Sequence, residues 1–92
     1  MINLSIIIPI YKEGKNIKAL INQITKNINV NDYEILFIDD NSEDGTEEIL
    51  KEINILNKKV KYIIRKEKKK DLSKSCILGF ENSKYSNILV MD

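Results

Sequence analysis

Acidic side chains follow several apolar stretches of this chain, and their types and positions could serve nucleotide chemistry. A carboxylate can accept a hydrogen bond from the imino N–H of a nucleobase or from a ribose hydroxyl. It can also bind a hard divalent cation, which would offset its repulsion of a diphosphate. The carboxylates in question are Glu13, Asp39, Asp40 and Asp92. They indicate a nucleotide site only if the fold brings their segments together.

The hydrophobic pattern predicts strands that alternate with helices. Continuous β-branched apolar runs are typical of strands buried on both faces, and apolar residues at three- and four-residue steps are typical of amphipathic helices. The expected strands are 4–10, 35–38, 60–65 and 86–91, and the expected helices start near Lys15, Asp44 and Asp71. The third strand alternates in part, so we expect it nearer the sheet edge.

This β-α-β-α-β-α-β order predicts a three-layer α/β/α fold with a Rossmann-like parallel sheet of four strands. With right-handed crossovers and a fourth strand that returns beside the first, the spatial order is 3-2-1-4. The switch point then lies between Pro9–Tyr11 and Met91–Asp92, with Asp39 and Asp40 next to it. Ligands of open α/β sheets bind in the crevice at such a point.

Local signals refine the helices. Asp44 and Glu47 have capping-box spacing, so Asp44 is the expected N-cap of the second helix. Its expected apolar side is Ile49, Leu50, Ile53 and Leu56. Asp71 is the expected N-cap of the third helix, and Gly79 inside that helix indicates close packing.

Composition excludes several classes of protein. A chain of 92 residues is at most one domain, and a net charge of +1 argues against a general nucleic-acid binder. The chain has no histidine, and its single cysteine, Cys76, cannot form an internal disulfide. No apolar run approaches the ~20 residues that span a bilayer. We expect a cytoplasmic protein without a transmembrane segment.

Two common nucleotide motifs are absent. The chain has neither a G-x-G-x-x-G after the first strand nor a Walker A sequence. Dinucleotide oxidoreductases and P-loop NTPases are therefore poor fits, and the acidic crevice must bind its ligand differently.

Four segments resemble the N-terminal part of the family 2 glycosyltransferases, which have the A-type fold. They are SIIIPIYKE (5–13), EILFIDDNSEDGT (34–46), LSKSCILGF (72–80) and ILVMD (88–92). The third is similar to the dolichol- and polyprenyl-phosphate sugar transferases, the dolichol-phosphate mannosyltransferase group. The resemblance covers residues 1–92 as one domain that binds a nucleotide sugar.

The resemblance implies a role for each matching position. The residues implied to line the nucleotide pocket are Pro9, Tyr11 and Glu13. Ile38 and Asp40 would contact the base, with Asp39 beside them. Asp92 would be the first Asp of a D-x-D that holds Mg²⁺ or Mn²⁺ against the diphosphate of a UDP- or GDP-sugar. The acceptor implied by the subgroup is a polyprenyl or dolichyl phosphate, reached at the cytoplasmic face of the membrane.

The chain departs from the family at two informative places. It stops at Asp92, before the second Asp of the D-x-D, so we expect an incomplete domain that is inactive alone and has no catalytic residue of its own. Asp71 stands where the lipid-phosphate subgroup has Gly. The alternative function is a nucleotide-binding module or pseudoenzyme that acts with a complementing chain or as a homo-oligomer.

Each functional interpretation competes with a simpler one. Asp39 and Asp40 also suit an ordinary turn, Glu13 a helix start and Tyr11 a packing position. The basic run 65–70 is either a solvated loop or a contact for a diphosphate or an anionic head group.

Overall fold

A computed structural model describes residues 2–91 and contains the predicted alternation of strands and helices. The first half comprises β1 (Asn3–Ile10), a short 3-10 helix (Gly14–Asn16), α1 (Ile17–Asn27) and β2 (Asp32–Asp39). The second half comprises α2 (Thr46–Leu56), β3 (Val60–Ile64), α3 (Leu72–Glu81) and β4 (Asn87–Val90).

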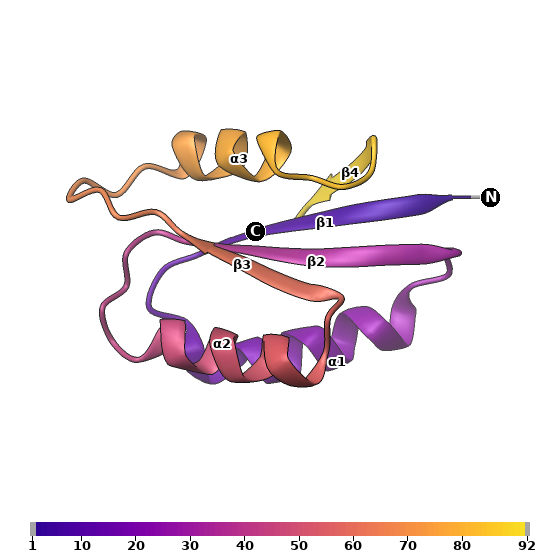
Figure 1. The fold of residues 1–92 in the computed structure, drawn as a ribbon, viewed down its shortest axis with the longest axis horizontal. Coiled ribbons are helices and arrows are strands. Elements are labelled where there is room, and N and C mark those ends of the chain that lie inside the picture. The colour runs from indigo at the N-terminus through magenta and orange to yellow at the C-terminus, as the bar shows by residue number, and fades with distance from the viewer. Residues whose placement is uncertain (1, 92) are drawn as a thin grey trace.

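The four strands form one parallel sheet in the order β3-β2-β1-β4. The helices α1 and α2 cover one face of this sheet and α3 covers the other, which gives three layers (Figure 1). The register places Ile6 of β1 between Ile35 of β2 and Leu89 of β4. The predicted fold class and strand order, and the edge position of the third strand, are confirmed.

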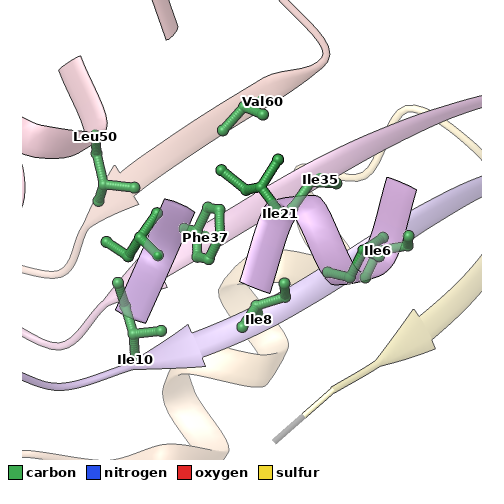
Figure 2. Close-up of a cluster of buried hydrophobic side chains, with 10 residues drawn as sticks. Ile6, Ile8, Ile10, Ile21, Ile35, Phe37, Leu50 and Val60 are labelled. Atoms are coloured by element: carbon green, nitrogen blue, oxygen red, sulfur yellow. The ribbon is translucent and has the colours of Figure 1, made fainter. Parts of the chain in front are cut away.

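The larger core lies between the sheet and the helices α1 and α2. Side chains of alternate strand residues point to this face because successive residues of a strand face opposite sides. Figure 2 shows Ile6, Ile8 and Ile10 of β1 packed with Ile35 and Phe37 of β2. The helices complete this core with Ile17, Ile21, Ile24 and Leu50. Phe37 and Leu50 have no exposed surface.

The core on the α3 face is smaller. It consists of Ile7, Leu36 and Ile38, with partly buried residues around them. The helix contacts the sheet closely because Gly79 has no side chain: a Cβ there would lie 2.4 Å from Cγ2 of Ile7. The close packing predicted from Gly79 is therefore confirmed, and Ser75 is the other buried residue of this helix.

A buried polar network also lies on the α3 face. Ser5 donates to the Glu34 carboxylate at 2.6 Å, and Lys61 donates to its other oxygen at 2.9 Å. The backbone N–H of Lys84 donates to Glu34, and that of Tyr85 donates to Ser5 Oγ. Burial raises the pKa of Glu34, but these hydrogen bonds outweigh it, so the pKa lies below its ordinary value.

Two details of α2 differ from the expectation. The N-cap is Gly45, with φ of 94°, and not Asp44. Asp44 still serves the helix start, since its carboxylate accepts from the N–H and the hydroxyl of Thr46, which lowers its pKa. Leu56 is 89% exposed and does not share the buried side with Leu50, because it is the last residue of the helix and lies beyond the core. The expected Asp71 N-cap is confirmed by a 3.1 Å hydrogen bond from Lys74 N–H.

Candidate functional site

A cavity of about 170 Å³ lies at the carboxyl ends of β1 and β2 and beside the start of α3. It is lined by Pro9, Ile10, Tyr11, Glu13, Asp40, Lys70, Leu72 and Ser75. Four of the residues that the sequence singled out therefore meet in one cavity: Pro9, Tyr11, Glu13 and Asp40. They come from two segments about thirty residues apart in the sequence, and the parallel pairing of β1 with β2 joins them.

Asp40 is the most constrained carboxylate of the cavity. It is 5% exposed, its Oδ1 accepts from Nε of Arg65 at 2.7 Å, and the same oxygen forms an ion pair with Nη2 at 2.7 Å. Its Oδ2 accepts from the backbone N–H of Asp71 at 2.7 Å. A buried ion pair with further hydrogen bonds keeps the carboxylate in one orientation and compensates its charge. Asp40 thus presents a fixed oxygen edge to whatever enters the cavity.

Arg65 also shapes the loop between β3 and α3. Its guanidinium donates to the Glu67 carboxylate and to the carbonyl of Lys69, in addition to Asp40. The loop thereby brings Lys70 to the cavity wall, where the ammonium lies 4.6 Å from the centre of the Tyr11 ring. Of the basic run, then, Arg65 is buried in the site and Lys70 lies at its edge.

Asp71 shows why an acidic residue is tolerated where the resembling subgroup has Gly. Its backbone N–H donates to Asp40, while its side chain accepts from Lys74 N–H and caps the N-terminus of α3. That hydrogen bond lowers the pKa of Asp71, so the group remains ionised as a helix cap. The extra negative charge is thus partly compensated by the helix start.

Asp39 points to the opposite face from Asp40. Its carboxylate accepts from both the N–H and the hydroxyl of Ser42, and Ser42 Oγ in turn accepts from the N–H of Lys12 at 2.7 Å. Burial raises the pKa of Asp39 above its ordinary value, although the Ser42 bonds act against this. Asp39 does not line the cavity; it ties the loop after β2 to the loop that carries Tyr11 and Glu13.

The two loops beside the cavity hold unusual backbone conformations. Lys12, Asn41 and Glu43 have φ of 54°, 59° and 54°, and within residues 2–91 they are the non-glycine residues with positive φ. Such conformations cost of order 1–3 kcal/mol each and cluster at functional sites. The strain lies in the loops after β1 and β2, which also supply Tyr11, Glu13 and Asp40.

The other two predicted site residues are placed differently. Ile38 has no exposed surface and belongs to the core with Ile7 and Leu36, so it does not line the cavity. Asp92 lies outside the described residues. Met91, the residue before it, donates its N–H to the Ile7 carbonyl at 2.9 Å, alongside β1.

Three contributors to this site were not predicted from the sequence. They are Arg65 and Lys70, which belong to the basic run 65–70, and Ser75. Ser75 is 1% exposed, and its Oγ has no hydrogen-bond partner among the residues that the structure describes. A signal existed: Ser75 and Gly79 are small residues four positions apart in α3, and a helix packs most closely along such a stripe.

Two larger cavities are less suited to a nucleotide. One of about 420 Å³ beside Asp39 is lined largely by acidic side chains, which repel phosphate: Glu43, Asp44, Glu47 and Glu48. The other, of about 510 Å³ between α1 and β4, is lined mainly by apolar residues such as Leu4, Leu20 and Met91. The smaller cavity combines polar groups, a cation and fixed walls.

The described chain offers neither a metal cluster nor a membrane span. Within residues 2–91, no three His, Cys, Asp or Glu side chains are grouped so that they could hold a metal ion. The carboxylate of Asp40 is engaged by Arg65, which makes it a poor metal ligand. None of the helices formed by these residues is both long and apolar enough to cross a membrane.

Comparison with known proteins finds one matching family model and several relatives. The family model described as glycosyl transferase family 2 matches residues 5–92. A dolichol-phosphate mannosyltransferase of Pyrococcus furiosus is 36% identical over 88 residues, which cover 96% of this chain and 24% of the relative. Its counterpart in Saccharomyces cerevisiae is 31% identical over 94 residues, covering 99% and 35%. A chondroitin synthase of Escherichia coli is 31% identical over 90 residues, covering 97% and 13%. The chain therefore spans between about an eighth and a third of the length of these relatives.

Proposed function

Because the chain belongs to glycosyltransferase family 2, we propose that its cavity binds the nucleoside diphosphate of a sugar donor, a UDP- or GDP-sugar, for transfer of the sugar to an acceptor. The observation that carries this proposal is the convergence of Pro9, Tyr11, Glu13 and Asp40 on one cavity at the carboxyl ends of β1 and β2. Ligands of open α/β sheets bind at that edge.

Each wall residue has a role suited to its chemistry. Asp40 accepts the imino N–H of the base, because its carboxylate is held in place by Arg65 and retains acceptor capacity. Tyr11, half-buried at the wall, packs against the base or ribose, and Glu13 accepts from a ribose hydroxyl. Ile38 supports the base from the core, and Asp39 positions the Tyr11–Glu13 loop through Ser42.

Lys70 supplies positive charge at the cavity wall, where the phosphates of a bound nucleotide would extend outward. Its ammonium contacts the Tyr11 ring and has no carboxylate partner among the ion pairs of residues 2–91. Lys66, by contrast, pairs with Glu47 at 3.2 Å. A free ammonium beside a nucleotide pocket attracts a diphosphate.

The metal of this proposal depends on Asp92 and not on the cavity. A Mg²⁺ or Mn²⁺ ion bound by one or two protein carboxylates takes its remaining ligands from phosphates and water, so Asp92 could supply one ligand. When bound, the ion neutralises charge on the departing nucleoside diphosphate. The role proposed for the residues of the described chain is to bind and orient the nucleotide.

The acceptor is proposed from the relatives. Two of them are named dolichol-phosphate mannosyltransferases, and the α3 segment resembles that subgroup. A polyprenyl phosphate is accordingly the acceptor class we propose for the protein, reached at a membrane surface.

Calorimetric titration with UDP and GDP tests the nucleotide site. We expect at least one of them to bind, and Asp40→Asn to weaken that binding by roughly tenfold or more, since a carboxylate acceptor becomes an amide. Glu48→Gln is the matched control, because it removes the same charge from an exposed position on α2 and should retain wild-type affinity.

Because Asp40→Asn disturbs the buried pair with Arg65, its thermal unfolding is measured alongside. Tyr11→Ala at the cavity wall provides a second variant without a buried charge. No binding of either nucleotide to the folded wild-type protein, or equal affinity in Asp40→Asn, Tyr11→Ala and Glu48→Gln, would refute the proposal.

A further inference from the structure

The hydroxyl of Ser75 is a buried polar group without a partner in a cavity wall. It is 1% exposed, and it is the buried side-chain polar atom that lacks a hydrogen bond within residues 2–91. Burying a hydroxyl without a hydrogen bond is unfavourable, because its hydrogen bonds to water are lost without replacement. Ala has a higher helix propensity than Ser, so helix formation does not explain a serine at this position.

Ser75 is coupled to Asp40 through the first turn of α3. The N–H of Asp71 donates to Asp40 Oδ2, and the carbonyl of Asp71 accepts from the N–H of Ser75 at 3.1 Å. Both Asp40 and Ser75 line the same cavity. A ligand edge that reaches the carboxylate can therefore also meet the hydroxyl.

The carboxylate has limited capacity left for a ligand. An ionised carboxylate has about four lone-pair sites. The Nε of Arg65 uses one of them on Oδ1, where Nη2 of the same guanidinium also lies 2.7 Å away, and the N–H of Asp71 uses one on Oδ2. Because both guanidinium nitrogens lie against Oδ1, the acceptor site left for a ligand is on Oδ2, which suits a base edge with a single N–H donor flanked by carbonyls.

We propose that Ser75 donates its hydroxyl to a ring carbonyl next to the imino N–H that Asp40 accepts, and that the base so recognised is uracil. Uracil has one imino N–H between two carbonyls. The N–H would donate to the free acceptor site of Asp40, and one carbonyl would accept from the hydroxyl of Ser75. Guanine places two adjacent donors on that edge, and the second would find no free acceptor on Asp40. Cytosine has an acceptor nitrogen where the carboxylate needs a donor. This inference rests on the proposed function, since it names the base of that same site.

The test is calorimetric titration of the protein with UDP, GDP and CDP, which share the diphosphate and differ in the base. We expect UDP to bind roughly tenfold or more tightly than either competitor, because a buried acceptor that faces another acceptor, or a buried donor without a partner, is unfavourable. Ser75→Ala should weaken UDP binding by roughly threefold to tenfold.

Ser73→Ala, on the exposed side of the same helix, should leave affinity unchanged and is the matched control. Without nucleotide, Ser75→Ala should unfold at the wild-type temperature or above it, because no hydrogen bond is lost. A serine that only packs would show that same melting behaviour but no loss of affinity.

The outcomes separate the two proposals. If GDP binds as tightly as UDP, or if Ser75→Ala matches Ser73→Ala, this inference is overturned while nucleotide binding stands. If none of the three nucleotides binds, both the inference and the proposed function fall.

Discussion

The two faces of the sheet are built differently, although the same strands supply both. The face beneath α1 and α2 holds a continuous apolar core in which Ile6, Phe37 and Leu50 are almost or wholly without exposure. The face beneath α3 holds a smaller apolar cluster together with the buried Ser5–Glu34 pair and the Asp40–Arg65 pair. Alternation along β2 produces both faces from consecutive residues.

We propose that this difference separates stability from ligand binding. The apolar face provides most of the burial that holds the domain together. The α3 face satisfies its buried polar groups with one another except for the Ser75 hydroxyl, and it borders the cavity. Asp39 and Asp40 show the division at single-residue scale: the first secures a loop, and the second faces the cavity.

The largest expected effect tests the apolar face. Phe37→Ala should lower the free energy of unfolding by about 3–5 kcal/mol, because it leaves a cavity at a fully buried aromatic position. Leu36→Ala, its neighbour on the α3 face, is the matched variant and should cost about 2 kcal/mol, the lower end for such a deletion. Urea unfolding measures both, and equal losses would contradict the proposed imbalance of the faces.

The next effect tests how closely α3 approaches the sheet. Gly79→Ala should destabilise by about 1–3 kcal/mol, because the new Cβ would lie 2.4 Å from Cγ2 of the buried Ile7 and force the helix outward. On an exposed helix position the same change would stabilise by nearly 1 kcal/mol. Thermal unfolding distinguishes the signs, with Lys74→Ala on the exposed side as control; a higher melting temperature for Gly79→Ala would show that the contact is loose.

The smallest effect tests the polar half of the α3 face through pH. The folded-state pKa of Glu34 lies below its ordinary 4.5, so its ionised form stabilises the fold above about pH 4.5 and that contribution is lost as pH falls through the folded pKa. Glu34→Gln should therefore be less stable than wild type by about 1–2 kcal/mol at pH 7, with the gap closing below pH 4.5.

Urea unfolding of the Glu34→Gln variant and wild type between pH 7 and pH 3 checks this prediction. The effect of pH on stability through Asp39 has the opposite sign. Burial raises the folded-state pKa of Asp39, so its ionisation destabilises the fold above that pKa, and this destabilisation disappears as pH falls. A stability gap for Glu34→Gln that stays constant across this range would mean that the charge of Glu34 is not what the network requires.

The fold could be predicted because its signals are local and repeated. Apolar runs such as 4–10 and 35–38 specify buried strands, and their alternation with amphipathic segments leaves few topologies. Helix ends were harder: Asp44 has the right spacing for an N-cap, but Gly45 takes that position because its positive φ costs a glycine little. Leu56 fits the helical period yet lies beyond the core, since periodicity does not say where the core ends.

The site was predictable only where residues follow strands. Pro9, Tyr11, Glu13 and Asp40 line one cavity, as expected, because parallel strands bring their carboxyl ends to one edge. Arg65 and Ser75 could not be assigned in the same way, since their importance lies in partners that are distant in sequence or missing. The pairing of Arg65 with Asp40 spans 25 residues, and the lack of a partner for Ser75 Oγ has no sequence signature.

The Ser5–Glu34 network also has a kinetic consequence. Its donors include the N–H groups of Lys84 and Tyr85, which lie 50 and 80 residues from their acceptors. Such contacts close only after most of the chain has been ordered, and a sheet without local hairpins gives them no short route. We expect β4 to join the sheet late in folding. The hydrogen bonds of Lys84 and Tyr85 would then form last, after the core beneath α1 and α2 has packed.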